Sequence, residues 1–164
     1  VVVFVEPIAL YPMRDLLEPG DGAWMTCYPD PDQRLSLSDV GVHGEGSDLA
    51  ILTYGNGHYL SRQAQADLAA QGVQTRVIDL RWIAPLAEEA IIAAIGTRPV
   101  LIVDECRRSG GQAEALMALL QERGIKGYAR LTAEDSFIAT GPAYAATLPS
   151  RESIVTAAHS LLGR

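Results

Sequence analysis

Apolar and polar positions alternate in a regular way from Asp48 onward. Short runs of β-branched and other apolar residues are separated by segments in which apolar residues recur every three to four positions. The runs are typical of buried strands, and the segments are typical of helices with one buried face. Strands are therefore expected over residues 49–54, 75–80, 100–103 and 128–132.

Helix boundaries are indicated by glycine and by capping residues. Helices are expected over residues 59–71, from Pro85 to Ile95 and up to Gly124, each ending at or beside a glycine. Ser109 and Gln112 match the Ser-x-x-Gln capping box, and Ser150 can cap a closing helix. Residues 55–57, Gly-Asn-Gly, are expected to form a turn between the first strand and the first helix.

Alternating strands and helices of this length require right-handed crossovers between parallel strands. The fold class is therefore α/β, with a mainly parallel sheet covered by helices on both faces. Residues 40–44 are a candidate edge strand, whose direction the pattern leaves open.

The first 47 residues differ from the rest in composition and in the pattern of apolar positions. Five of the nine prolines lie between Pro7 and Gly46, which is typical of a connector. Residues 1–5, Val-Val-Val-Phe-Val, read as a strand buried on both faces, yet the connector offers nothing to pair with it. We expect residues 1–11 to be the last strand of a preceding domain, 12–47 a connector with an edge strand, and 48–164 the α/β domain.

Composition excludes several classes of function. The chain has 164 residues, about one domain, and carries 13 basic against 20 acidic residues with no basic cluster, so nucleic acid is not expected as a partner. No uncharged apolar run approaches the roughly 18 residues that span a bilayer, so no membrane partner is expected. Cys27 and Cys106 lie far apart without metal-ligand spacing, which favours a reduced, cytoplasmic setting.

Polar side chains follow the predicted strands, where open parallel sheets bind ligands. The alternative is that these residues only cap helices, tie loops and pair at the rim. Residues 55–57 followed by Asp79 partly match a dinucleotide fingerprint, but Leu60 stands where the third glycine belongs. The set comprises Asn56, Asp79, Arg81, Glu105, Arg107 and Ser109.

Histidine and serine add little further chemistry. His43, His58 and His159 lack Cys, Asp or Glu neighbours at metal-ligand spacing and are expected to be structural. His58, beside the predicted Gly turn, is the one candidate for a proton shuttle or phosphate contact. Ser109 has no histidine near it in sequence, and the capping box already accounts for it.

Three separated blocks resemble one family. They read Leu-Thr-Tyr-Gly-Asn-Gly at 52–57, Val-Ile-Asp-Leu-Arg-Trp-Ile-Ala-Pro-Leu at 77–86 and Val-Asp-Glu-Cys-Arg-Arg-Ser-Gly-Gly at 103–111. In this order they resemble the C-terminal domain of transketolase-like thiamine diphosphate enzymes. The similarity is strongest to the E1 component of 2-oxo acid dehydrogenases, as a beta subunit or a fused alpha/beta form. Residues 4–11 resemble the end of that family's pyrimidine-binding domain.

The resemblance implies a three-layer α/β/α domain with a five-stranded sheet, whose short first strand is antiparallel to the others. It also implies that thiamine diphosphate and magnesium are bound in the full-length enzyme by upstream domains. No catalytic, cofactor-binding or metal residue is therefore carried over to this chain, and Glu6 is not the family's activating glutamate. Gly20-Asp21-Gly22 is similar to the family's magnesium motif, but it follows Leu17-Glu18-Pro19 instead of a buried strand, so a loop is expected.

The function implied is that of a non-catalytic E1 domain. It would serve association with the rest of E1, as a homodimer or alpha2beta2 assembly, and docking to the E2 acyltransferase. The alternatives are the same domain of a transketolase or deoxyxylulose-phosphate synthase, or a stand-alone Rossmann-like small-molecule domain. Which 2-oxo acid is the substrate cannot be read from these residues. Candidate interface residues are Arg81, Trp82, Glu105, Arg107, Gly110 and Gly111.

Overall fold

The computed structural model describes residues 1–139 and 141–164, and its centre is one five-stranded sheet. The strand order is β1-β3-β2-β4-β5; β1 is antiparallel to β3, and the other neighbours are parallel. This confirms the expected fold class, including the short antiparallel edge strand. The strands are β1 (Gly41–His43), β2 (Leu49–Thr53), β3 (Thr75–Asp79), β4 (Val100–Arg107) and β5 (Tyr128–Ala133).

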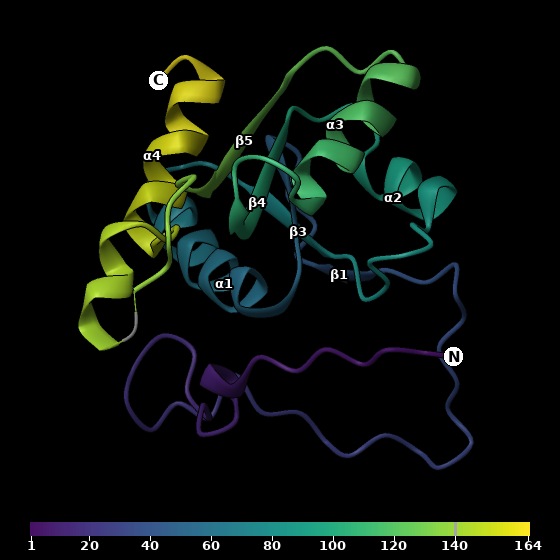
Figure 1. The fold of residues 1–164 in the computed structure, drawn as a ribbon, viewed down its shortest axis with the longest axis vertical. Helices are drawn as coiled ribbons and strands as arrows, with labels where there is room; N and C mark the ends of the chain where they lie inside the picture. Colours follow the sequence, from purple (N-terminus) through teal and green to yellow (C-terminus); the bar gives the residue numbers. More distant parts are fainter. Residues whose placement is uncertain (140) are drawn as a thin grey trace.

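Four α-helices of the described residues cover the two faces of the sheet in pairs, which gives the three-layer α/β/α arrangement (Figure 1). One pair packs with β2 and β4 in a core that includes Ala64, Leu68 and Ile154, and the other in a core that includes Ile91 and Leu116. The first pair is α1 (Gly55–Ala70) and α4 (Arg151–Leu162), and the second is α2 (Glu88–Ile95) and α3 (Gln112–Glu122).

Strand β2 lies between β3 and β4, and all five of its residues are buried. Successive side chains on a strand point to opposite faces. Leu49 and Ile51 accordingly join the core under α1 and α4, whereas Ala50 and Leu52 join the core under α2 and α3. A strand buried on both faces needs a continuous apolar run, which explains the pattern of this segment.

The predicted turn at residues 55–57 is wrong, because these residues form the first turn of α1. Gly57 lets this first turn lie directly on the sheet. A Cβ atom at Gly57 would stand 2.5 Å from the Thr53 Oγ1 atom. Helix α2 begins three residues after Pro85, at Glu88.

The two predicted caps have different outcomes. The Ser150 cap is confirmed, since its side chain accepts a hydrogen bond from the Ser153 amide while the Ser153 hydroxyl reaches the Ser150 amide. The Ser109 capping box is wrong. The N-cap of α3 is Gly111, without a side-chain cap, and the Ser109 hydroxyl donates instead to Asp135 Oδ2 at 2.6 Å.

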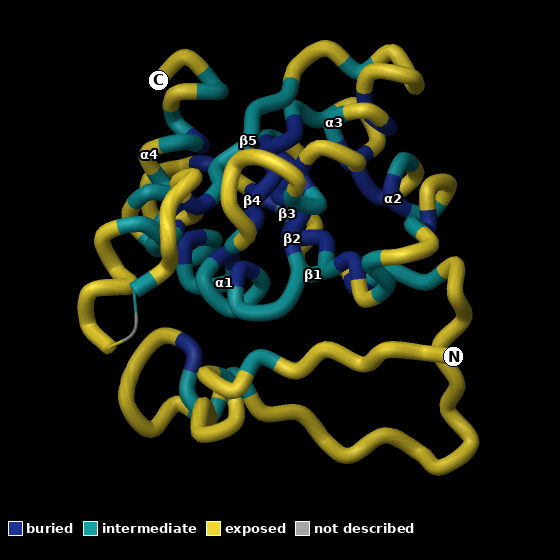
Figure 2. The backbone as a smooth tube through the Cα atoms, viewed as in Figure 1, coloured by how far each residue is buried: buried dark blue, intermediate teal, exposed yellow. Residues whose placement is uncertain are grey.

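Residues 1–40, called the arm from here on, form no strand and run beside the domain (Figure 1). The only element in the arm is a short 3-10 helix at Ile8–Leu10. Residues 1–5 are exposed along their whole length instead of forming a buried strand in this chain (Figure 2). Their assignment to a preceding domain stays a prediction.

None of the helices in residues 1–139 and 141–164 is both long and apolar enough to cross a membrane.

Candidate functional site

The candidate interface residues gather along the carboxyl edge of the sheet. Arg81 and Trp82 follow β3, whereas Glu105 and Arg107 end β4. Gly110 and Gly111 lie just before α3. Because β3 and β4 both run parallel to β2 and flank it, their ends meet the start of α1 at this edge.

Hydrogen bonds tie the loops of this edge to one another. The Asn56 amide donates to Glu105 Oε1 at 2.6 Å, and the Gln112 amide donates to the Ile83 carbonyl at 3.1 Å. Burial raises the pKa of Glu105. The Ser109 amide donates to Asp135 at 2.8 Å. These contacts agree with the alternative interpretation of the polar set, in which its members tie loops and pair at a rim.

Asp104 on β4 connects the loops of this edge through buried hydrogen bonds. No pattern in the sequence singled it out. Its side chain is 1% exposed and accepts three hydrogen bonds, from the Tyr54 hydroxyl at 2.6 Å and from the Cys106 and Ala113 amides at 2.8 Å. Burial and the bond to Asp104 raise the pKa of Tyr54 well above its ordinary value. The available signal was an acidic residue directly after a buried apolar run and ahead of a helix.

Gly111 permits the close approach on which this arrangement depends. A Cβ atom there would lie 2.9 Å from the Arg107 carbonyl oxygen and 3.0 Å from Asp104 Oδ2. The bond from the Ala113 amide to Asp104 satisfies one of the free donors in the first turn of α3. The buried carboxylate therefore replaces the side-chain cap that was predicted at Ser109.

The loop after β3 joins the domain to the arm. Arg81 adopts φ 52°, a left-handed conformation that is uncommon for residues other than glycine, and its Nε lies 4.0 Å from Asp79 Oδ2. Burial raises the pKa of Asp79. The Trp82 indole donates to the Ser36 carbonyl at 2.8 Å, so part of this side chain already contacts the arm.

The Gly20-Asp21-Gly22 motif forms a closed loop in the arm. Asp21 accepts hydrogen bonds at 2.8 to 3.0 Å from four backbone amides, which lowers its pKa well below the usual range. Asp15 accepts from the Gly20 and Gly22 amides. Both Asp21 oxygens are thus engaged by the backbone and Asn56 is bonded to Glu105, so these residues do not fit a magnesium or thiamine diphosphate site.

Two of the three histidines are brought together by the fold. The His43 and His58 rings lie 4.7 Å apart, whereas the His159 ring bonds to Gln71. Their proximity depends on β1 and α1 packing side by side, so no spacing in the sequence indicates it. In residues 1–139 and 141–164, no group of three or more His, Cys, Asp or Glu is placed to hold a metal ion.

The chain is similar in sequence to known proteins over most of its length. Residues 38–154 match the family model described as "Transketolase, C-terminal domain". The chain is 28% identical over 166 residues to the pyruvate dehydrogenase E1 component subunit beta of Bacillus subtilis (strain 168), covering 98% of this chain and 48% of that protein. For the same subunit of Staphylococcus aureus (strain Mu50 / ATCC 700699), identity is 30% over 139 residues, covering 82% and 43%.

Solved structures show the same fold. A split gene transketolase, described as an inactive beta4 tetramer, has a TM-score of 0.70 at 23% identity, covering 82% of this chain and 44% of that one. The 2-oxoglutarate:ferredoxin oxidoreductase of Magnetococcus marinus has a TM-score of 0.57 at 19% identity, covering 76% and 20%. The chain spans about half the length of the curated relatives it matches.

Proposed function

Because this chain belongs to the transketolase C-terminal domain family, we propose that it is the C-terminal domain of a 2-oxo acid dehydrogenase E1 component. It serves association with the remaining parts of E1 and docking to the E2 acyltransferase. The observation that carries this proposal is the similarity to an E1 beta subunit over 98% of the chain, the arm included. In the whole enzyme, thiamine diphosphate and magnesium are bound by other domains.

The chemistry of the carboxyl edge supports an interface. The loops are fixed to one another, so exposed side chains on them are presented by a rigid base. Arg81 and Arg107 are exposed on these loops. Arginine is enriched among interface anchors, and loss of an anchor typically costs about 2 kcal/mol, or roughly thirtyfold in affinity. Trp82 is half-buried and already bonded to the arm, so the two arginines are the stronger candidates.

The test uses Arg81→Ala and Arg107→Ala in the full-length enzyme, with Lys126→Ala as the control. Lys126 is exposed just before β5, at the amino edge of the sheet. Sedimentation across a concentration series should show weaker assembly for the arginine variants alone, with activity reduced only as far as assembly is lost. Unchanged assembly beside a collapsed turnover number would make the edge catalytic and contradict the proposal.

Docking to E2 and the absence of a cofactor site in this chain are tested by separate measurements. Binding of purified E2 acyltransferase to full-length E1 should weaken when this domain is deleted, and unchanged binding would place docking elsewhere. Calorimetric titration of this chain with thiamine diphosphate and magnesium should show no saturable binding. One-to-one binding at micromolar concentration would refute the proposed absence of a cofactor site.

A further inference from the structure

A cluster of aromatic and cationic side chains joins the arm to the domain. Trp24 of the arm lies with its ring centroid 5.3 Å from that of His58 on α1, and His58 lies 4.7 Å from His43 on β1. Trp24 also meets the edge of Tyr59 at 4.9 Å. His58 therefore lies in the contact between the arm and α1, and His43 lies directly behind it, ring against ring.

We propose that this cluster is a proton-operated latch, in which neutral His43 and His58 hold residues 15–25 of the arm against α1 and protonation releases them. The proposal concerns the position of the arm, and its test reads the exposure of Trp24 instead of the assembly of E1.

Residues 15–25 form a preformed unit with few attachments. The unit is closed by the side-chain carboxylates of Asp15 and Asp21, which accept hydrogen bonds from backbone amides within it. It is attached to α1 where the Tyr59 hydroxyl donates to the Asp15 carbonyl at 3.0 Å and the Gln63 amide donates to the Leu16 carbonyl at 2.7 Å. Besides Trp24, the main apolar anchor is Leu16, which is 6% exposed. A unit held at so few points can detach without unfolding the domain.

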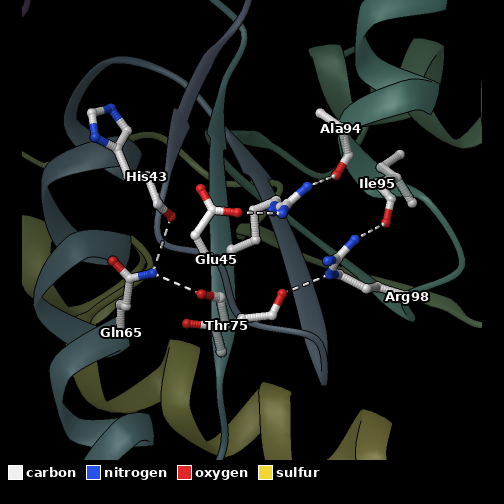
Figure 3. A network of polar contacts seen from close by, with 9 residues as sticks. His43, Glu45, Gln65, Thr75, Ala94, Ile95 and Arg98 are labelled. Carbon is white, nitrogen blue, oxygen red and sulfur yellow. Dashed lines mark hydrogen bonds and ion pairs between the residues drawn. The ribbon is translucent and has the colours of Figure 1, made fainter.

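A hydrogen bond to the backbone carbonyl of His43 fixes the position of this residue. The Gln65 side chain on α1 donates to the His43 carbonyl at 3.2 Å and to the Thr75 carbonyl at 2.9 Å, as Figure 3 shows. The Arg62 Nη1 atom lies 2.8 Å from His43 Nδ1. A guanidinium can only donate, so Nδ1 must accept, which requires an imidazole without a proton on that nitrogen.

The charged groups that face the two rings disfavour protonation of His43 and His58. Arg62 on α1 and Arg81 after β3 face both His43 and His58, and Asp79 on β3 is the one carboxylate that faces His43. That carboxylate is shared with Arg81 and is itself largely buried. The His58 Nε2 atom is buried without a hydrogen-bond partner among the described residues, so an N–H there would also lack an acceptor.

Burial is the main cause that lowers the pKa of both histidines to about 4, and the neighbouring cations add to it. A released imidazole returns toward its ordinary pKa of about 6.5. Docking is therefore fully favoured above that pH and weakens as the pH falls toward 4. Between pH 7.5 and 5 the docking constant falls by at most about thirtyfold for each histidine. The second proton binds less readily because the rings repel once charged.

Trp24 reports the position of the arm directly. The chain has two tryptophans, so Trp82→Phe leaves Trp24 as the only one. Acrylamide quenching of this variant is measured from pH 7.5 to 4.8, with far-UV circular dichroism on the same samples. We expect quenching to rise severalfold toward the acid end while the circular dichroism stays constant. Constant quenching over this range would overturn the proposal.

Matched variants in the Trp82→Phe background identify the titrating groups. His43→Gln with His58→Gln should abolish the pH dependence, and His159→Gln should leave it intact. A transition that persists in the double variant would show that other groups operate the latch. If the double variant is quenched at every pH, Arg62→Gln decides. Removal of this cation raises the pKa of the docked histidines toward the released value, which weakens the drive for release. A release midpoint shifted to lower pH supports the latch, and an unshifted midpoint refutes it.

Discussion

The arm and the domain, residues 41–164, are ordered in different ways. The domain is built on two apolar cores on either side of β2, whose residues are all buried. The arm holds its shape through carboxylates that accept from backbone amides, and it carries most of the exposed large apolar residues of the chain (Figure 2). An apolar run therefore needs a partner surface, as well as the right composition, to become part of a core.

Residues 1–5 show this most clearly. They form the most continuous apolar run of the arm, yet each is at least 76% exposed. The edge strands of the sheet are β1 and β5, and neither they nor any other described strand pairs with this run. A run of this kind with unpaired backbone groups tends to associate with another chain.

The largest difference between the two regions should appear on removing one leucine from each. Leu52→Ala opens a cavity beside β2, where the side chain is 0% exposed, and should lower the free energy of unfolding by about 2–5 kcal/mol. Leu37→Ala, in the arm, removes a side chain that is 53% exposed and should change it by less than about 0.5 kcal/mol. Urea denaturation measures both. Comparable losses would mean that the arm is part of the core.

A smaller loss is expected from the buried carboxylate of the domain. Asp104→Ala leaves the Tyr54 hydroxyl and the Ala113 amide without their acceptor and should cost about 1–3 kcal/mol. Asp135→Ala is the control, because its carboxylate is exposed and also accepts from the same loop, at Ser109. Thermal denaturation should show a clear fall in melting temperature for Asp104→Ala and none for Asp135→Ala. Equal effects would show that burial of Asp104 is unimportant.

The ion pair between α1 and α4 lies at the rim of the domain and should contribute less. Arg151 donates two hydrogen bonds to Asp67, and each side chain is 33% exposed, so the coupling should stay below about 1 kcal/mol. These bonds lower the pKa of Asp67. The contribution is therefore present above the ordinary aspartate pKa of about 3.9 and is lost as the pH falls through the lowered value.

A double-mutant cycle with Asp67→Asn and Arg151→Gln measures this coupling. It should be detectable at pH 7 and absent once Asp67 is protonated. A coupling that is unchanged in acid would assign the contact to packing instead of charge.

The smallest effect on the domain should come from shortening the arm. Deletion of residues 1–11 removes exposed apolar side chains and no core residue, so solubility should rise and the melting temperature should not fall. Light scattering and calorimetry measure the two quantities. A large loss of thermal stability would show that residues 1–5 belong to this core after all.

Local sequence was sufficient where short-range physics decides the outcome. The apolar runs predicted β2, β3 and β5 to within one residue, whereas β4 extends four residues beyond its predicted end. Ser150 capped α4 as expected because a cap depends on residues within one turn. The turn predicted at residues 55–57 was wrong, and the start of α1 there was missed, because the reason for Gly57 lies in Thr53 and in the neighbouring strand β4. The Ser109 cap failed because Asp135, distant in the chain, competes for the same hydroxyl.

The sequence by itself determined the order of strands and helices, the parallel sheet and the edge at which its polar residues gather. Periodicity and chain connectivity act over short distances, so they can be read from the residues directly. Tertiary structure decided which polar groups meet, as in the bond from Tyr54 to Asp104 across 50 positions and the contact of Trp24 with His58. It also left residues 1–5 exposed, because burial depends on the surface that a segment finds and not on its own composition.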